Sequence, residues 1–364
     1  MPENAASGAD IEPIQVTLLT GFLGSGKTTL LNRLVRHPAM VETAVLINEF
    51  GEIGLDHQLV ERIDDNTVLL NAGCLCCTVQ GDLVNALSDL FIRRVKEQVP
   101  SFRRVLIETT GLADPAPIIH TLMTAPVVSN RFALDGIVTT VDAVNADAQL
   151  DRHPESVKQA AVADRIVLTK SDLVAPDALA ALEDRLHALN PGAPIEKAVM
   201  GEIHPDRLFD TGLYDPKTKT VDVQRWLREE AYLKRDHGHG HGHDHAHDHG
   251  HRNDPNRHDE SIAAFCMTRD EPLDWEAFVA WIRILIGQHG ERLLRIKGIL
   301  NIAGRDRPIA VHGVQHMFHD PAELAAWPDD DRRSRIVFIT RDLDRSAIEE
   351  KLDSLQAQAA ALDK

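Results

Sequence analysis

The chain has 364 residues, enough for about two domains that each bury a core. Its formal net charge of -17 argues against nucleic acid as the main partner, because phosphate backbones are bound by basic surfaces. No apolar run of about 18 residues predicts a membrane span, and Met1 to Pro13 shows no secretory signal. Four cysteines, three of them clustered, are too few for a disulfide framework. We therefore expect a cytoplasmic protein with reduced thiols.

The segment Gly21–Thr28 reads G-F-L-G-S-G-K-T and fits the phosphate-binding loop of nucleotide hydrolases. It lies between a strand predicted over 14–20 and a helix predicted over 29–35, the context that separates this motif from a chance glycine turn. We expect nucleotide contacts from Gly21, Gly24, Ser25, Gly26, Lys27, Thr28 and Thr29. Among these, Lys27 would reach the β- and γ-phosphates, and the Thr28 hydroxyl would hold Mg²⁺.

Two acidic segments follow later predicted strands. Asn48–Asp56 comes after a strand over 43–47, where a loop can sense the γ-phosphate or Mg²⁺, although a solvated acidic loop is the alternative. A strand over 104–107 ends in E-T-T-G, in which Glu108 would orient Mg²⁺ or its waters and the Gly111 N–H would reach the γ-phosphate. An incidental helix cap is the alternative for this second segment. Glu49 and Glu108 are the candidates for handling the attacking water.

Three thiols directly follow a strand predicted over 67–70, at Cys74, Cys76 and Cys77. Thiolates are soft ligands that suit Zn²⁺ or Cu(I). One C-x-C-C cluster supplies three sulfurs at most, and the open position that this leaves fits a transfer site better than a closed structural site. The fourth position would go to a carboxylate, a His, water or a partner's ligand, with Glu49 or Glu52 as a possible extra ligand. The alternatives are small buried thiols or a redox-sensing group.

The segment Thr169–Asp172 reads T-K-S-D and follows a strand predicted over 165–168. It is close to N-K-x-D, the guanine-reading element, with Thr169 in place of the usual Asn. The Asp172 carboxylate can accept hydrogen bonds from N1–H and the exocyclic amine of guanine, and adenine offers no such pair. The Lys170 stem can lie along the base. The alternative is that Asp172 caps a helix before Leu173.

An internal stretch from His237 to His251 alternates histidine with glycine, aspartate and alanine. It cannot build a core, and its imidazoles are metal ligands at neutral pH. We interpret it as a tethered metal-collecting loop rather than an inert linker or an expression tag. The candidate ligands are His237, His239, His241, His243, His245, His247, His249 and His251.

Strands and helices alternate through 14–209, which predicts an α/β phosphate-binding domain with a mostly parallel sheet covered on both faces. Besides the elements above, this part is expected to hold helices over 82–98 and 176–190 and strands over 134–141 and 194–198. A flexible tail over 1–13 precedes it, and a linker over 210–260 carries the His-rich loop. A smaller α+β domain follows over 261–364, with strands over 262–267, 293–300, 308–311 and 335–339 and helices over 273–287 and 343–362. Cys266 is expected in its core.

With these pieces assembled, the chain resembles the CobW-like metallochaperone GTPases, also called the G3E family. The resemblance rests on 21–32, 48–52, 73–77, 108–111 and 169–172, together with the His-rich loop and the C-terminal domain, and it covers nearly the whole chain. The chain is most similar to the zinc-transferring branch, the zinc-regulated GTPase metalloprotein activators. In that branch the C-x-C-C motif carries Zn²⁺, and GTP hydrolysis is coupled to delivery into a client metalloprotein.

The resemblance therefore implies a GTPase that cycles between GTP and GDP with Mg²⁺ and carries Zn²⁺ to an unidentified client. Lys27, Glu108 and Glu49 are the expected catalytic residues. Other branches of the family serve cobalt in cobalamin synthesis or iron, so Co²⁺ is an alternative metal. A GTP-regulated metal store or sensor is an alternative function. An ATP-dependent kinase is another, because the phosphate loop alone does not select the base.

Overall fold

The computed structural model describes residues 13–48, 68–72, 79–209 and 261–362 of the chain. The predictions made for Glu49, Glu52, the three clustered cysteines and the His-rich stretch lie outside these residues. Within the described part, no helix combines the length and the apolar character needed to cross a membrane.

A seven-stranded parallel sheet forms the N-terminal part, with the strand order β3-β2-β4-β1-β5-β6-β7. Its strands are β1 (Ile14–Gly21), β2 (Thr43–Asn48), β3 (Val68–Ala72), β4 (Arg104–Glu108), β5 (Phe132–Asp142), β6 (Arg165–Thr169) and β7 (Ile195–Ala198). Because all the strands are parallel, their carboxyl ends meet at one edge, where ligands of such sheets bind. The segments that follow β1, β4, β5 and β6 therefore share that edge.

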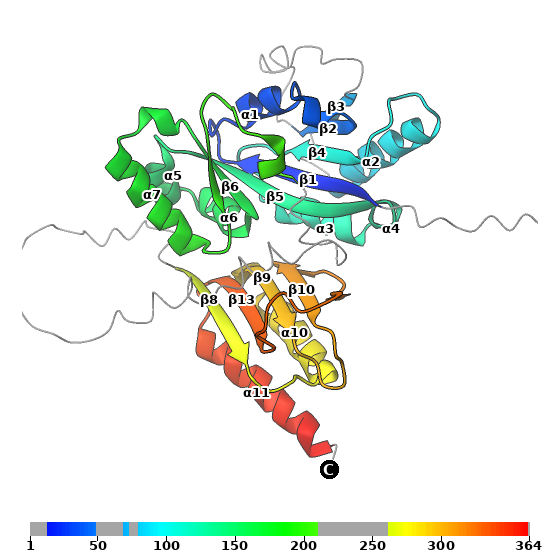
Figure 1. The fold of residues 1–364 in the computed structure, drawn as a ribbon, viewed down its shortest axis with the longest axis vertical. Helices are drawn as coiled ribbons and strands as arrows, with labels where there is room; N and C mark the ends of the chain where they lie inside the picture. Colours follow the sequence, from blue (N-terminus) through cyan, green and yellow to red (C-terminus); the bar gives the residue numbers. More distant parts are fainter. Residues whose placement is uncertain (1–12, 49–67, 73–78, 210–260, 363–364) are drawn as a thin grey trace, which may run out of the picture.

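Helices cover both faces of this sheet (Figure 1). They are α1 (Lys27–Leu34), α2 (Val79–Val95), α3 (Ala116–Thr124), α4 (Pro126–Ser129), α5 (Ala146–Arg152), α6 (Pro154–Val162) and α7 (Pro176–Leu189), with short 3-10 turns η1 (Pro38–Met40), η3 (Ser171–Leu173) and η4 (Pro205–Arg207). The hydrophobic pattern predicts none of the helices α3 to α6. Each is nine residues or fewer, too short to repeat an apolar stripe, and α3, α4 and α6 have a proline at their first or second position.

The C-terminal part is a six-stranded antiparallel sheet in the order β11-β10-β9-β13-β8, with β12 paired to β10. Its elements are β8 (Ile262–Arg269), α10 (Trp275–His289), η5 (Gly290–Arg292), β9 (Leu293–Leu300), β10 (Ile309–Val314), β11 (Met317–Phe318), β12 (Ala322–Glu323), β13 (Ser334–Arg341) and α11 (Arg345–Leu362). The predicted fold class, a parallel α/β domain followed by a smaller α+β domain, is confirmed.

Both faces of the antiparallel sheet are buried, as strand β13 shows. Ile336 and Phe338 pack into one core with α10 and α11, whereas Val337 and Ile339 pack into a second core that the sheet shares with the N-terminal part. Successive side chains of a strand point to opposite faces, so this alternation follows from the period of two. Cys266 of β8 lies in the shared core, as predicted.

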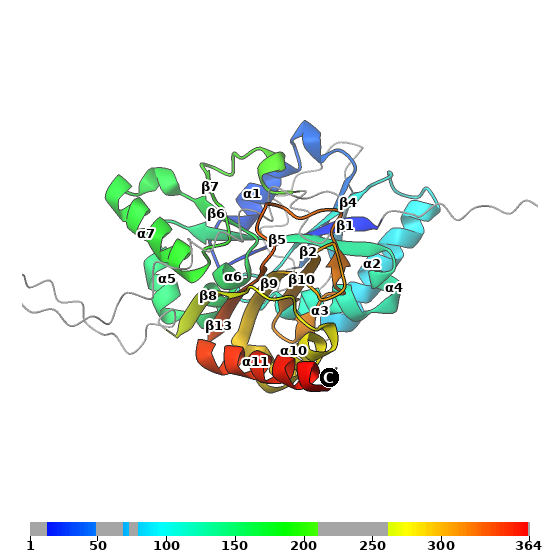
Figure 2. The same ribbon diagram turned by 60° about the horizontal axis from the view of Figure 1, so that its bottom comes forward.

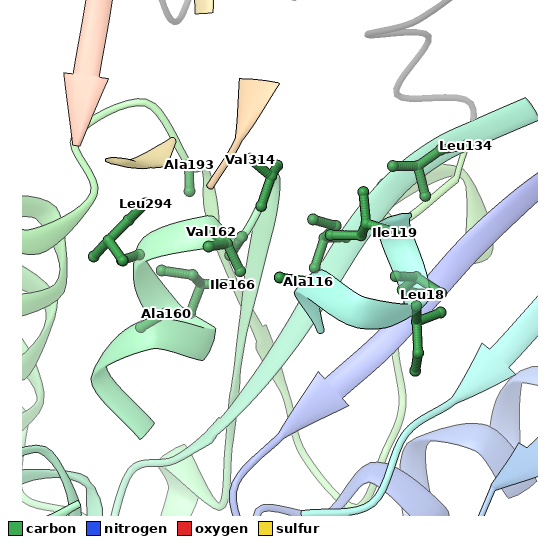
Figure 3. Packing of buried hydrophobic residues seen from close by; sticks show 14 of the residues in the cluster. Leu18, Ala116, Ile119, Leu134, Ala160, Val162, Ile166, Ala193, Leu294 and Val314 are labelled. Carbon is green, nitrogen blue, oxygen red and sulfur yellow. The ribbon is translucent and has the colours of Figure 1, made fainter. Parts of the chain in front are cut away.

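The two sheets meet across a layer of helices, because α3 and α6 lie between the parallel sheet and the C-terminal sheet (Figures 1 and 2). Figure 3 shows residues of this shared core. Ala160 and Val162 of α6 lie in the same cluster as Leu294 of β9 and Val314 of β10. Ile119 of α3 belongs to it as well. The apolar contact makes α6 a common element of the two parts.

A buried ion cluster joins the two parts at the start of β6. Asp164 is fully enclosed, and its Oδ1 accepts from Arg295 Nη2 at 2.5 Å and lies 2.7 Å from Lys297 Nζ. Its Oδ2 accepts from the Ile137 N–H at 3.0 Å. Although burial raises the pKa of Asp164, the charges of Arg295 and Lys297 outweigh burial and hold the pKa below its ordinary value. The carboxylate therefore stays ionised between the two parts.

Candidate functional site

The glycines of the loop after β1 adopt backbone conformations that other residues rarely take. Gly24 and Gly26 have φ values of 74° and 88°, and Gly21 has φ 142°. A Cβ at Gly21 would stand 2.3 Å from Thr140 Oγ1 and 2.4 Å from the Thr140 carbonyl oxygen. Backbone conformation therefore favours glycine at all three positions, and space requires it at Gly21, where the chain leaves β1.

Lys27, the first residue of α1, directs its ammonium group back over the loop. Its Nζ donates to the carbonyl oxygens of Gly21 at 2.8 Å and Phe22 at 3.1 Å, and the residue is 9% exposed. The first turn of α1 holds no acidic residue, and no side chain caps its N-terminus. A cation beside the positive end of a helix favours an anion there, which suits a phosphate group.

Thr28 and Glu108 come from different elements, and the fold brings them together. The Thr28 hydroxyl donates to Glu108 Oε1 at 3.1 Å, and Glu108 is 5% exposed. A hydroxyl and a carboxylate oxygen at this separation can share one cation, and Mg²⁺ prefers such hard oxygen ligands. The chemistry of this pair fits a magnesium ion.

Buried hydroxyl groups connect the ends of β1, β4 and β5 beneath the loop. Ser25 Oγ lies 2.6 Å from Thr140 Oγ1, which also donates to the Thr20 carbonyl oxygen at 3.2 Å. Thr109 Oγ1 donates to Thr20 Oγ1 at 2.9 Å. The loop therefore lies on a layer of buried hydroxyl groups. Thr140 belongs to this layer, and no role was predicted for it.

Gly111 packs directly against the phosphate-binding loop. A Cβ at this position would stand 2.7 Å from the Leu23 backbone nitrogen and 2.8 Å from Leu23 Cα. The close approach needs a residue without a side chain, although the backbone of Gly111 is not in a left-handed conformation. The segment after β4 therefore lies against the loop, where a γ-phosphate contact was predicted.

The end of β6 also binds the phosphate-binding loop. Thr169 Oγ1 lies 2.7 Å from the Ser25 carbonyl oxygen and 3.3 Å from that of Val141, and donates to the nearer oxygen. Lys170 follows in a left-handed conformation, with φ 55°. Its Nζ donates to the Gly24 carbonyl oxygen at 2.9 Å and Asp142 Oδ2 at 2.7 Å. Both residues therefore tie the predicted guanine-reading segment to the loop.

Asp142, at the end of β5, is the anion that pairs with Lys170, and no role was predicted for it. Burial raises the pKa of Asp142, but hydrogen bonds from Lys170, Asn145 and the Val144 N–H outweigh burial and hold it below its ordinary value. In the sequence, its position directly after the strand predicted over 134–141 could have indicated a role at the ligand edge.

Asp172 lies in η3 and is exposed. Lys170 is the N-cap of η3 and Ala175 that of α7, so Asp172 caps neither helix, and the capping alternative is wrong. The structure thus leaves Asp172 open to a ligand at the edge where β1 and β6 end.

Gln159 of α6 is a further residue that the sequence analysis missed. It is 1% exposed, and its Nε2 donates to the carbonyl oxygens of Gly111 at 3.2 Å and Ala113 at 3.0 Å. No motif marks this residue, because its role depends on where α6 lies relative to the end of β4.

The predicted zinc ligands and Glu49 lie outside the described residues. Within the described residues, no group of three or more His, Cys, Asp or Glu side chains could hold a metal ion. Thr29, also predicted as a nucleotide contact, is exposed in the first turn of α1.

Comparison with known proteins gives two family matches. Residues 15–197 match the model described as CobW/HypB/UreG, nucleotide-binding domain. Residues 262–356 match the cobalamin synthesis protein cobW C-terminal domain. The two matches coincide with the parallel-sheet part and the antiparallel-sheet part of the structure.

Individual relatives match over most of the chain. The zinc chaperone YjiA of Escherichia coli is 34% identical over 329 residues, covering 90% of this chain and 94% of that protein. The zinc chaperone CobW of Pseudomonas aeruginosa is 30% identical, with 93% and 90% covered. The crystal structure of Zn(II)-bound YjiA GTPase superimposes with a TM-score of 0.67 at 29% identity, covering 94% of this chain and 99% of that one. These matches confirm the predicted family, and the chain belongs to the CobW/HypB/UreG family.

Proposed function

We propose that this chain is a GTP-hydrolysing metallochaperone that binds zinc at Cys74, Cys76 and Cys77 and transfers it to a client metalloprotein. The observation that carries the proposal is the hydrogen bond from the Thr28 hydroxyl to Glu108 Oε1 next to Lys27, because these groups would suit a magnesium ion and a phosphate. Similarity to zinc chaperones over about nine-tenths of the chain supports the choice of cargo. The proposed setting is the cytoplasm, without nucleic acid or membrane partners.

In this proposal the loop Gly21–Thr28 and Thr29 surround the phosphates, and Lys27 neutralises charge on the β- and γ-phosphates. Thr28 and Glu108 hold Mg²⁺, which supplies charge stabilisation at the phosphates when bound. Gly111 donates its N–H to the γ-phosphate. Glu49 and Glu108 are the candidates for orienting the attacking water.

The base is read at the edge where β6 ends. Asp172 accepts from N1–H and the exocyclic amine of guanine, and Lys170 covers the base while its ammonium group stays paired with Asp142. Thr169 holds this segment to the loop through the Ser25 carbonyl oxygen. Guanine selection follows because adenine would leave the carboxylate without its two donors.

Zinc is the cargo of the proposed reaction. Three thiolates bind it, Glu52 or Glu49 supplies a further ligand, and the His237–His251 stretch collects the metal through eight weaker imidazole sites. The cysteine segment follows β3 and the Glu49 segment follows β2, which are neighbouring strands whose carboxyl ends lie at the nucleotide edge. Hydrolysis of GTP changes the affinity for zinc through these segments.

Equilibrium zinc binding under competition, measured with GDP and with a non-hydrolysable GTP analogue, tests the proposal. We expect zinc affinity to differ between the two nucleotides, and zinc to change nucleotide affinity by the same factor. If neither affinity responds to the other ligand, the coupling does not exist. Preferential turnover of ATP would contradict the role of Asp172 and would favour the kinase alternative.

Two variants separate a chaperone from a metal store. Cys76→Ala should lose the tight zinc site and keep GTP binding, whereas Cys266→Ala, which removes a buried core thiol, is the matched control and should keep both. Deleting Asp236 to His251 should leave the single tight site intact. A store or sensor would instead lose most of its zinc capacity on that deletion.

A further inference from the structure

The loop that follows β4 is held by side chains from two different parts of the molecule. On one side, Gln159 of α6 donates through Nε2 to the carbonyl oxygens of Gly111 and Ala113. Both partners are acceptors, so the orientation of this amide follows from its contacts. The loop cannot move away from α6 without breaking two hydrogen bonds to the buried Gln159 amide.

Asp114, the next residue of this loop, receives several donors at once. Lys158 of α6 lies 3.2 Å from Asp114 Oδ2, and the Ala116 N–H donates to Oδ1 at 3.0 Å. A further donor comes from the C-terminal part, because Gln315 Nε2 lies 3.2 Å from Oδ2 and 3.4 Å from Oδ1. A residue about 200 positions further along the chain thus contacts the loop that carries Gly111.

Gln315 is itself held in one place by its turn. It lies in the two-residue connection between β10 and β11, flanked by the paired residues Val314 and Met317. Its φ is 51°, a left-handed conformation that costs a non-glycine residue free energy and persists only where surrounding structure imposes it. The neighbouring His316 lies so close to Gly290 that a Cβ there would stand 2.2 Å from His316 Cδ2. The turn therefore has little freedom to shift.

We propose that Gln315 is a positioning residue for the nucleotide site, acting through Asp114 on the loop that carries Gly111. The inference rests on the proposed function, in which the Gly111 N–H binds the γ-phosphate. A donor aimed at the γ-phosphate stabilises it best when the donor is already in place, and Gln315 contributes part of that placement. The C-terminal domain is then a structural part of the GTPase site.

The consequence distinguishes GTP from GDP, because only GTP carries the γ-phosphate. Loosening the loop should weaken binding of a GTP analogue and lower kcat, and should leave GDP affinity unchanged. By linkage, the GTP analogue should also strengthen the contact between Gln315 and Asp114. If Gln315 only stabilised the fold, its replacement would change the affinities for both nucleotides or for neither.

The test uses the full chain and two substitutions at one position. Gln315→Gly removes the amide and fits the left-handed backbone, so the turn is kept. Gln315→Glu places a carboxylate against Asp114. We expect the affinity for a non-hydrolysable GTP analogue to fall roughly three- to tenfold in Gln315→Gly and further in Gln315→Glu, with kcat falling in parallel and GDP affinity unchanged, as calorimetry and turnover would measure. The analogue-to-GDP ratio is the affinity for the GTP analogue divided by the affinity for GDP. If this ratio is unchanged in both variants, the proposal is overturned.

Gln356→Ala is the matched control, because Gln356 also makes two hydrogen bonds but makes them within the C-terminal part, to the backbone of Asp274. Its analogue-to-GDP ratio should stay at the wild-type value. A fall equal to that of Gln315→Gly would contradict a specific role for Gln315.

Gly111→Ala separates the inference from the proposed function. The added methyl group would meet Leu23 and displace the loop. If this variant keeps the wild-type analogue-to-GDP ratio, the γ-phosphate role of Gly111 fails. If the analogue-to-GDP ratio falls in Gly111→Ala but stays at the wild-type value in both Gln315 variants, the γ-phosphate role of Gly111 stands. Only the positioning role of Gln315 then fails.

Discussion

Thr169 occupies the position where the guanine-reading element usually has an asparagine, and it keeps a structural contact there. Its hydroxyl donates to the Ser25 carbonyl oxygen at 2.7 Å, and its methyl group lies 3.3 Å from where a Cβ at Gly26 would stand. One short side chain therefore joins β6 to the phosphate-binding loop.

Removing this hydroxyl should weaken the binding of GDP and of a GTP analogue by the same factor. Thr169→Val keeps the shape and leaves the Ser25 carbonyl without this donor, which costs about 1 kcal/mol, or roughly fivefold in affinity. Calorimetry with GDP and with a GTP analogue checks this expectation. Thr169→Ser restores the hydroxyl and should restore most of the affinity; failure of that rescue would contradict the role of the hydrogen bond.

In the proposed function, base selection depends on Asp172. Asp172→Asn should lower GDP affinity by about 100-fold or more, because the amide offers one acceptor where guanine presents two donors. The same variant should gain affinity for xanthosine diphosphate, whose second carbonyl group can accept from the new amide. Titrations with GDP and with xanthosine diphosphate measure the loss of one affinity and the gain of the other. Asp177→Asn, also exposed, is the control, and equal losses in both variants would contradict the assignment.

At the scale of elements, two histidines near the buried ions lie in β10 and directly after β11. Burial is the largest cause that lowers the pKa of His319 to about 3, and the charge of Arg295 lowers it further although Asp164 opposes it. Burial likewise lowers the pKa of His312 well below its ordinary value. His319 also donates its backbone N–H to the His312 carbonyl oxygen at 2.8 Å. Both imidazoles are therefore neutral in the folded protein at neutral pH.

A histidine kept neutral by folding contributes its full stability only above its pKa in the unfolded chain. As pH falls from 6.5 towards 3, the unfolded chain binds a proton at His319 and the folded protein does not, so stability falls. The expected loss is about 1.4 kcal/mol of unfolding free energy per pH unit for this residue. Denaturation at about pH 7.5, 6.5 and 5.5 should show a shallower pH slope in His319→Gln than in the wild type. An identical slope in His319→Gln and in the wild type would refute the assignment.

At the scale of the whole molecule, the two parts share a core and the ion cluster around Asp164. Asp164→Asn would leave Arg295 and Lys297 buried without their carboxylate, which costs about 3–5 kcal/mol. Chemical denaturation should show this loss. Lys297→Met removes one of the two cations, so the double variant should recover part of the lost stability. If Asp164→Asn alone were as stable as the wild type, the ion cluster would not stabilise the contact between the two parts.

The parallel α/β fold, the smaller C-terminal domain and the phosphate-binding loop could all be predicted from the amino-acid sequence. Local patterns specify these features, because a buried strand, a glycine-rich turn and a helix start each leave a mark within a few residues. Two contacts of the site could also be predicted, because the carboxyl ends of parallel strands meet at one edge. They are the contact of Thr28 with Glu108 and the contact of Thr169 with the loop.

The residues that support the site could be identified only from the folded structure. Asp142, Gln159 and Gln315 belong to no motif, and the helix that carries Gln159 is too short to show a periodic stripe. Their roles arise from contacts between segments that lie from about 30 to about 200 residues apart in the chain. Such contacts depend on how the layers stack, because packing of both faces of the C-terminal sheet places the β10–β11 turn against the loop after β4.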